Sequence, residues 1–165
     1  MIYASIEASI VGLICFLIGE NLSNLVHDGK GFIDGLWCMI SALVVLQSII
    51  GDSLKTAKAR IVGTMMGSVI AGLVCIVFGY GYSAILLSIG LCVFILNLLN
   101  FEDGVRIATA TAAVITGYGF VNPEYSPLIN AVMRSADTLI GVLFSILVVY
   151  ISLKCKIRKT SSTHS

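Results

Sequence analysis

Two arginines are the residues of this sequence that most directly suggest chemistry, because each opens the same short pattern. One copy runs Arg60-Ile-Val-Gly63-Thr64-Met-Met-Gly67, and the other runs Arg134-Ser-Ala-Asp137-Thr138-Leu-Ile-Gly141. Both follow Arg-x-x-x-Thr-x-x-Gly. A guanidinium presents paired donors that match a carboxylate. We therefore expect a small organic anion to bind at Arg60, Thr64, Arg134 and Thr138.

Of the two arginines, Arg134 is the stronger candidate for a functional role. It lies within an apolar segment, where a cation is costly and faces either a partner or a watery cavity. Asp137 follows three residues later, close enough to pair with it on one helix face. Two interpretations stay open, a neutralised structural pair or an anion contact that Asp137 tunes. For Arg60 the alternative is a basic anchor at a helix end.

Carboxylates inside apolar segments are candidates for proton transfer. Glu20 lies late in the first apolar segment, close to Asn21 and Asn24, and we expect Glu20 or Asp137 to be a proton-coupling group. For Glu20 the alternative is an interfacial carboxylate that water satisfies. The glycines of the two arginine patterns predict close helix packing, because small residues let backbones approach one another in lipid. These glycines are Gly63, Gly67 and Gly141.

The composition predicts that these residues belong to an integral membrane protein. Of 165 residues, 58% are hydrophobic and 12% are charged, and the mean hydropathy is +1.01. A soluble domain has about a quarter of its residues charged, and in water this chain would expose larger apolar patches than soluble monomers tolerate. A membrane-spanning helix needs roughly 20 apolar residues, so the length accommodates six spans and little else.

Six apolar segments separated by turn residues predict an all-α fold of six transmembrane helices. The segments are Ile6–Leu25, Phe32–Gly51, Ile61–Gly79, Tyr82–Leu99, Val105–Val121 and Leu128–Leu153. Gly51-Asp52-Ser53 forms one of the predicted turns. We expect one transmembrane domain over residues 1–153 and a short, basic cytoplasmic tail over residues 154–165.

The distribution of basic residues predicts the orientation, because Lys and Arg favour the cytoplasmic side. With the N-terminus inside, eight of the ten basic residues fall inside: Lys55, Lys58, Arg60, Arg106, Lys154, Lys156, Arg158 and Lys159. Only Lys30 and Arg134 fall outside. We expect both termini to be cytoplasmic and the membrane to be a bacterial inner membrane.

The chain contains a second repeated sequence pattern besides the arginine patterns. Phe32-Ile-Asp34-Gly35 enters the second apolar segment, and Phe101-Glu-Asp103-Gly104 enters the fifth. Two matches in the same order predict a duplicated three-helix unit, whose second copy inserts upside down because three is odd. Such inverted repeats are typical of transporters, with the working site near the midplane. Chance is the alternative, since Arg, Thr and Gly are common at helix starts.

Several classes of function find no support in the sequence. The net charge is +1, and no basic stripe predicts nucleic-acid binding. No HExxH, GxSxG, P-loop or GxGxxG pattern occurs, so we expect neither an enzyme nor a cofactor. The five cysteines have no CxxC spacing, which argues against a metal site.

One stretch of the chain contains Trp37-x-x-Ile-Ser41, an aliphatic run that ends in Gln47, then Gly51 and the first arginine pattern. This stretch resembles the membrane domain of the FUSC family, the fusaric acid resistance and aromatic acid exporter proteins, which are related to aluminium-activated malate channels. The second arginine pattern and Thr111-x-x-Val-Ile add a weaker match. Ser48 stands where the family usually has Pro.

The resemblance implies a transport protein that moves organic anions, aromatic carboxylates among them, outward across the membrane. In this hypothesis Arg60 and Arg134 attract the carboxylate. The alternative is a membrane scaffold or accessory subunit without a solute path. Larger family members have a long cytosolic domain and often a second membrane half. We therefore expect this chain to work as a homodimer or with a partner membrane subunit.

Overall fold

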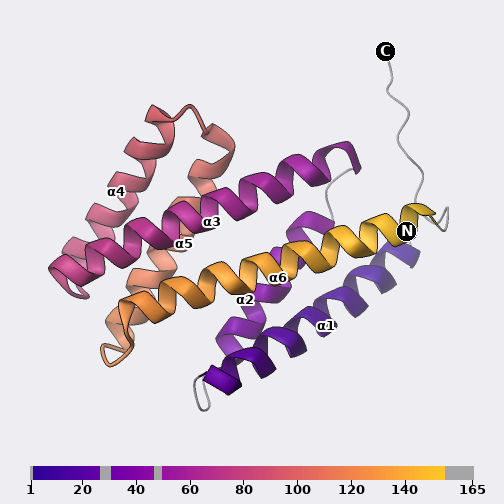
Figure 1. Cartoon of the computed structure of the whole chain (residues 1–165), viewed down its shortest axis with the longest axis horizontal. Helices are drawn as coiled ribbons and strands as arrows, with labels where there is room; N and C mark the ends of the chain where they lie inside the picture. The colour runs from indigo at the N-terminus through magenta and orange to yellow at the C-terminus, as the bar shows by residue number, and fades with distance from the viewer. Residues whose placement is uncertain (1, 27–30, 47–49, 155–165) are drawn as a thin grey trace. The chain divides into compact units, whose positions relative to one another are not determined.

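The computed structural model describes residues 2–26, 31–46 and 50–154, and all regular structure in these ranges is α-helical (Figure 1). The predicted all-α fold is confirmed for this part of the chain. Six helices follow one another: α1 Ile2–Val26, α2 Gly31–Leu46, α3 Ile50–Phe78, α4 Tyr82–Leu98, α5 Glu102–Val121 and α6 Pro127–Lys154. The predicted tail, apart from Lys154, lies outside the described residues, as does Gln47 of the family pattern.

The prediction of a turn at Gly51-Asp52-Ser53 is wrong, because α3 begins at Ile50 and runs through it. A single Gly costs a helix only about 1 kcal/mol relative to Ala, and the next turn contains good helix formers. The turn after α3 does fall where it was predicted. Gly79 adopts a φ of 71°, which favours glycine, and its N–H donates to the Cys75 carbonyl at 2.9 Å.

Four of the described helices are long and apolar enough to cross a membrane. The spans are Ser5–Asn24, Leu54–Phe78, Glu102–Val121 and Pro127–Lys154. The other two apolar helices, Gly31–Leu46 and Tyr82–Leu98, are shorter. At 1.5 Å per residue their lengths are roughly 24–26 Å, somewhat below the thickness of a hydrocarbon core. The prediction of six spans therefore stays a prediction for α2 and α4.

The helices group into two compact units, whose borders fall inside α3 and α6. Unit 1 comprises residues 1–58 and 137–165, and unit 2 comprises residues 59–136. Unit 1 thus contains α1, α2, the first turns of α3 and most of α6. Unit 2 contains most of α3, then α4, α5 and the first turns of α6.

In unit 1, α1 and α2 pack closely as a hairpin (Figure 1). A Cβ at Gly35 would lie 2.7 Å from the Phe16 carbonyl oxygen, and one at Gly19 would lie 2.8 Å from the Cys38 Cβ. The second half of α6 joins this hairpin, because Ser145 Oγ donates to the Ala42 carbonyl at 2.7 Å. The small core consists of Val11, Cys15, Cys38, Ala42, Leu46 and Val149.

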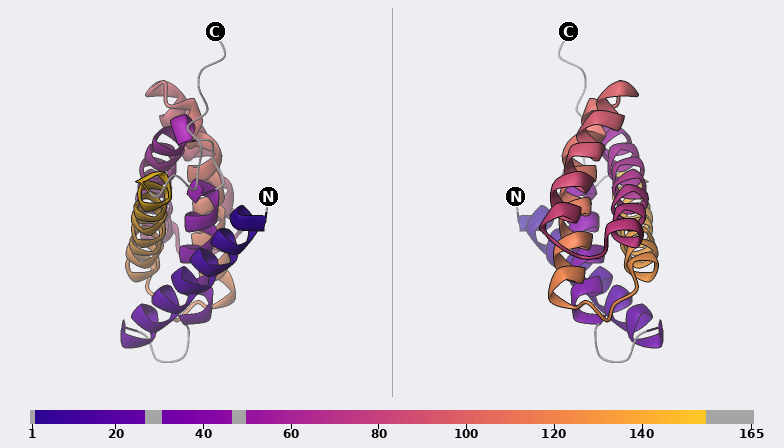
Figure 2. Two further views of the ribbon diagram at one scale, coloured as in Figure 1. Left: turned by 90° about the vertical axis from the view of Figure 1, so that its right-hand side faces the viewer. Right: turned by 90° about the vertical axis from the view of Figure 1, so that its left-hand side faces the viewer.

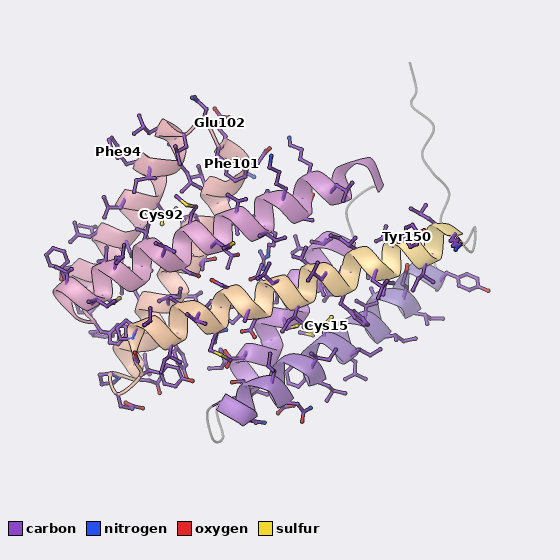
Figure 3. The ribbon with its side chains drawn as sticks, in the orientation of Figure 1. Cys15, Cys92, Phe94, Phe101, Glu102 and Tyr150 are labelled. Atoms are coloured by element: carbon purple, nitrogen blue, oxygen red, sulfur yellow. The ribbon has the colours of Figure 1, made fainter. Side chains whose placement is uncertain are left out.

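In unit 2, α4 and α5 lie side by side, as two further views also show (Figure 2). Cys92 lies on the buried side of α4, whereas Phe94 projects away from the unit with 66% of its surface exposed (Figure 3). At one end of the unit, the Tyr80 hydroxyl donates to the Tyr125 carbonyl at 2.9 Å. The α3–α4 and α5–α6 turns therefore lie at the same end.

Candidate functional site

Arg134 is a buried cation on the first turns of α6 in unit 2. Only 5% of its surface is exposed, although Pro127–Lys154 is a candidate membrane span. Burial of a guanidinium in such a helix is costly, which makes Arg134 a candidate functional residue. Asp137, one turn further along α6, is not exposed at all.

The directions of the helices in unit 2 determine what lies at the level of Arg134. Gly63 lies against Gly104, and Gly67 lies against Ala108, so α3 and α5 run in the same direction. A short turn connects α5 to α6, and the Asn130 amide donates to the Ile115 carbonyl at 3.2 Å. Helix α6 therefore runs opposite to α5, and hence opposite to α3.

This arrangement places a set of buried polar residues at one level of unit 2. Asn130 on α6 contacts Ile115 on α5, and the two helices run in opposite directions. One turn further into the unit, Arg134 on α6 therefore lies at the same level as Thr111 on α5. Ser68 lies close to this level, because α3 runs in the same direction as α5 and its residue Gly67 packs on Ala108, about one turn before Thr111. The exposed fractions of Thr111, Ser68 and Asn130 are 5%, 1% and 0%. The structure thus places hydroxyl and amide groups near the Arg134 level.

Arg60 and Thr64 belong to the same unit but lie at a different level. Arg60 precedes Ser68 by eight residues, or about 12 Å along the helix axis. Its side chain is partly exposed, whereas Thr64, one turn closer to Ser68, is 3% exposed. The two predicted anion-binding arginines therefore lie on one unit but not at one point.

The second half of the Arg134 pattern lies in unit 1, beyond the border at residue 136. Thr138 is 3% exposed, and its hydroxyl oxygen accepts a hydrogen bond from Ser41 Oγ at 3.4 Å. Ser41 is a residue of the family pattern on α2. The proposed binding residues are therefore divided, with Arg60, Thr64 and Arg134 in unit 2 and Thr138 in unit 1.

The final glycine of each arginine pattern lies at a close contact between helix backbones. A Cβ at Gly67 would lie 2.5 Å from the Ala108 carbonyl oxygen on α5, and one at Gly141 would collide with the Cys38 carbonyl oxygen on α2. The two units thus have the same construction. In each, the glycine of a third helix packs on the second helix of a hairpin.

The carboxylates of unit 1 differ in burial. Glu20, a predicted proton-coupling residue, is half-buried. Asp34, whose burial the sequence did not predict, is 2% exposed and accepts a hydrogen bond from the fully buried Ser23 hydroxyl. Glu7 accepts from Ser152 Oγ at 2.5 Å, so a carboxylate connects α1 to α6. The repeated Phe-x-Asp-Gly spacing was the one signal that could have indicated Asp34.

Tyr80 adds a polar group at the end of unit 2 where the α3–α4 turn lies. Burial of the side chain raises the pKa of Tyr80 to about 12. Its hydroxyl therefore stays protonated at neutral pH and donates to the Tyr125 carbonyl oxygen.

Among the described residues, His, Cys, Asp and Glu side chains form no group of three or more that could hold a metal ion.

Taken with the apolar spans, a buried arginine among buried hydroxyl and amide groups defines a helical membrane protein with polar groups inside its bundle. The sequence model of a family described as fusaric acid resistance protein-like matches residues 10–148. The chain belongs to this family, the FUSC family, as the sequence predicted. It is a family of membrane transport and resistance proteins and not of enzymes. No curated protein and no solved structure matches the chain.

Proposed function

We propose that the chain is a transport protein that moves small organic anions, aromatic carboxylates among them, out across an inner membrane. The observation that carries this proposal is the burial of Arg134 inside a candidate span, at the level of Ser68 and Thr111. A guanidinium in that setting offers a carboxylate charge-assisted, paired hydrogen bonds. Membership in a family of transport proteins makes a solute the expected anion.

The proposal includes six spans arranged as a 3+3 inverted repeat. It is supported by the common construction of the two units, in which Gly67 packs on α5 and Gly141 packs on α2. In the proposed repeat these are equivalent glycines and equivalent second helices. Each third helix would then pack on the hairpin of the other repeat. We also propose that the chain acts as a homodimer or with a partner subunit.

Flux measurements in liposomes test the transport function directly. We expect the purified protein to move aromatic and aliphatic carboxylates. The flux of their uncharged amides should equal that of empty liposomes, because an amide lacks the charge that Arg134 recognises. No flux above that of empty liposomes would support the scaffold function instead, and equal flux of carboxylates and amides would refute recognition of the solute charge by Arg134.

The orientation of the chain in the membrane is a separate prediction. In a cysteine-free background, Glu124→Cys should react with an impermeant thiol reagent added outside intact cells, and Lys55→Cys should react only after permeabilisation. Both side chains are exposed, so burial does not limit either reaction. The basic-residue distribution is the physical reason. Labelling of position 55 from outside, with protection at position 124, would reverse the topology.

A further inference from the structure

Two side chains inside unit 2 have buried polar atoms that the described residues leave unsatisfied. Ser68 on α3 is 1% exposed, and Asn130 on α6 is 0% exposed. The Asn130 amide nitrogen donates to the Ile115 carbonyl, but its Oδ1 atom and Ser68 Oγ have no hydrogen-bond partner among the described residues. Buried polar atoms in this state are rare, because each loses its hydration without compensation.

Other buried hydroxyls of the same unit show that Ser68 is an exception. Ser88 is also 0% exposed, and its Oγ donates to the Ile85 carbonyl at 3.1 Å. Thr116 Oγ1 donates to the Ala112 carbonyl at 2.8 Å. Such bonds to the preceding turn are the usual way in which a hydroxyl is satisfied within a helix. Ser68 lies mid-helix as well, but its hydroxyl does not make this bond.

Ser68 and Asn130 lie close to one another along the unit. Gly72, one turn after Ser68, has Ala131, the neighbour of Asn130, within 3.3 Å of its Cβ position. Because α3 and α6 run in opposite directions, the next turn of α6 after Asn130 carries Arg134 back toward the Ser68 level. The unsatisfied hydroxyl and amide oxygen therefore lie on adjacent turns beside a buried cation.

We propose that Ser68 and Asn130 line a hydrated passage through unit 2, between α3, α5 and α6, with Thr111 and Arg134 on the same passage. This inference rests on the proposed function, since it assigns the route that the solute takes. Water can donate to Asn130 Oδ1 and can both donate to and accept from Ser68 Oγ, whereas lipid chains can do neither. A buried polar site with several such partners is where ordered water is found.

Cysteine labelling tests the passage without requiring transport. In a cysteine-free background, Ser68→Cys and Asn130→Cys should react with a small, charged methanethiosulfonate reagent. Ser88→Cys is the matched control, since Ser88 is equally buried in the same unit but satisfied by its own helix. A thiol reacts as its thiolate, which forms readily only where water reaches it. We expect position 68 to react about ten-fold or more faster than position 88, which reacts only upon local opening.

Equal labelling at positions 68 and 88 would overturn the passage. A second measurement decides the case if Asn130→Cys does not fold. If Ser68 is dry, Ser68→Ala removes an uncompensated polar atom and should raise the melting temperature. If water satisfies Ser68, the same change should lower the melting temperature or leave it unchanged, as we also expect for Ser88→Ala. Labelling at position 68 in a protein without anion flux would retain the passage and refute only the proposed function.

Discussion

Replacing Arg134 by Gln should lower the rate of organic anion flux by about ten-fold or more, while the protein still folds. The change removes a charge-assisted hydrogen bond, which is commonly worth roughly 1.5–3 kcal/mol and corresponds to about ten-fold or more in affinity. Arg134→Lys should recover part of the flux, because an ammonium cannot present the paired donors of a guanidinium. Flux in liposomes and melting temperature in detergent are measured together for each variant.

A double mutant separates the transport function from the scaffold function. If Arg134 serves only to neutralise Asp137, then Arg134→Gln leaves a buried carboxylate uncompensated, and adding Asp137→Asn should restore stability and behaviour. If Arg134 binds the solute, the double mutant should fold normally and stay inactive. Arg106→Gln is the matched control, because Arg106 is exposed on α5 and should leave flux unchanged. Parental flux in the double mutant would exclude Arg134 as a solute contact.

Replacing Gly67 or Gly141 by Ala should destabilise the protein by about 1–3 kcal/mol, the usual cost of inserting a methyl group into a packed interior. At both positions the added Cβ meets a carbonyl oxygen of a neighbouring helix backbone, on Ala108 in unit 2 and on Cys38 in unit 1. A backbone atom cannot move aside as a flexible side chain does. The helices must therefore separate, and the melting temperature in detergent measures the loss.

Gly90 and Gly117 provide controls for the same substitution. Both lie inside helices, and a Cβ added at either would meet nothing within 4 Å. Gly90→Ala and Gly117→Ala should leave stability unchanged or raise it by up to about 1 kcal/mol, because Ala has the higher helix propensity. Equal melting temperatures for Gly67→Ala and Gly90→Ala would show that the backbone contact on α5 does not determine stability.

The part of the fold that follows from composition and apolar segments could be predicted from the sequence. All-helical structure and most helix ends follow from runs of apolar residues separated by Gly, Asn and Pro. Gly79 and Asn100, for example, adopt the positive φ angles that end α3 and α4. The start of α3 could not be predicted, because Gly51 and Asp52 favour a turn locally but do not prevent a helix when good helix formers follow.

The interior polar groups could be predicted only where a pattern pointed to them. Arg134 stood out because a cation within an apolar segment is unusual whatever its partners are. Ser68 and Asn130 did not, because serine and asparagine are ordinary in membrane helices. Their importance depends on contacts that Ser68 lacks and that Asn130 makes with a residue 15 positions away. Asp34 was missed for the same reason, since its partner Ser23 belongs to the preceding helix.

The borders of the two units divide the two helices that carry the arginine patterns. Neither border, after residue 58 or after residue 136, falls in a loop, and neither helix contains an interior proline. Arg60 lies two residues after the first border, and Arg134 lies two residues before the second. Each arginine therefore lies within one helical turn of the point where its helix passes from one unit to the other.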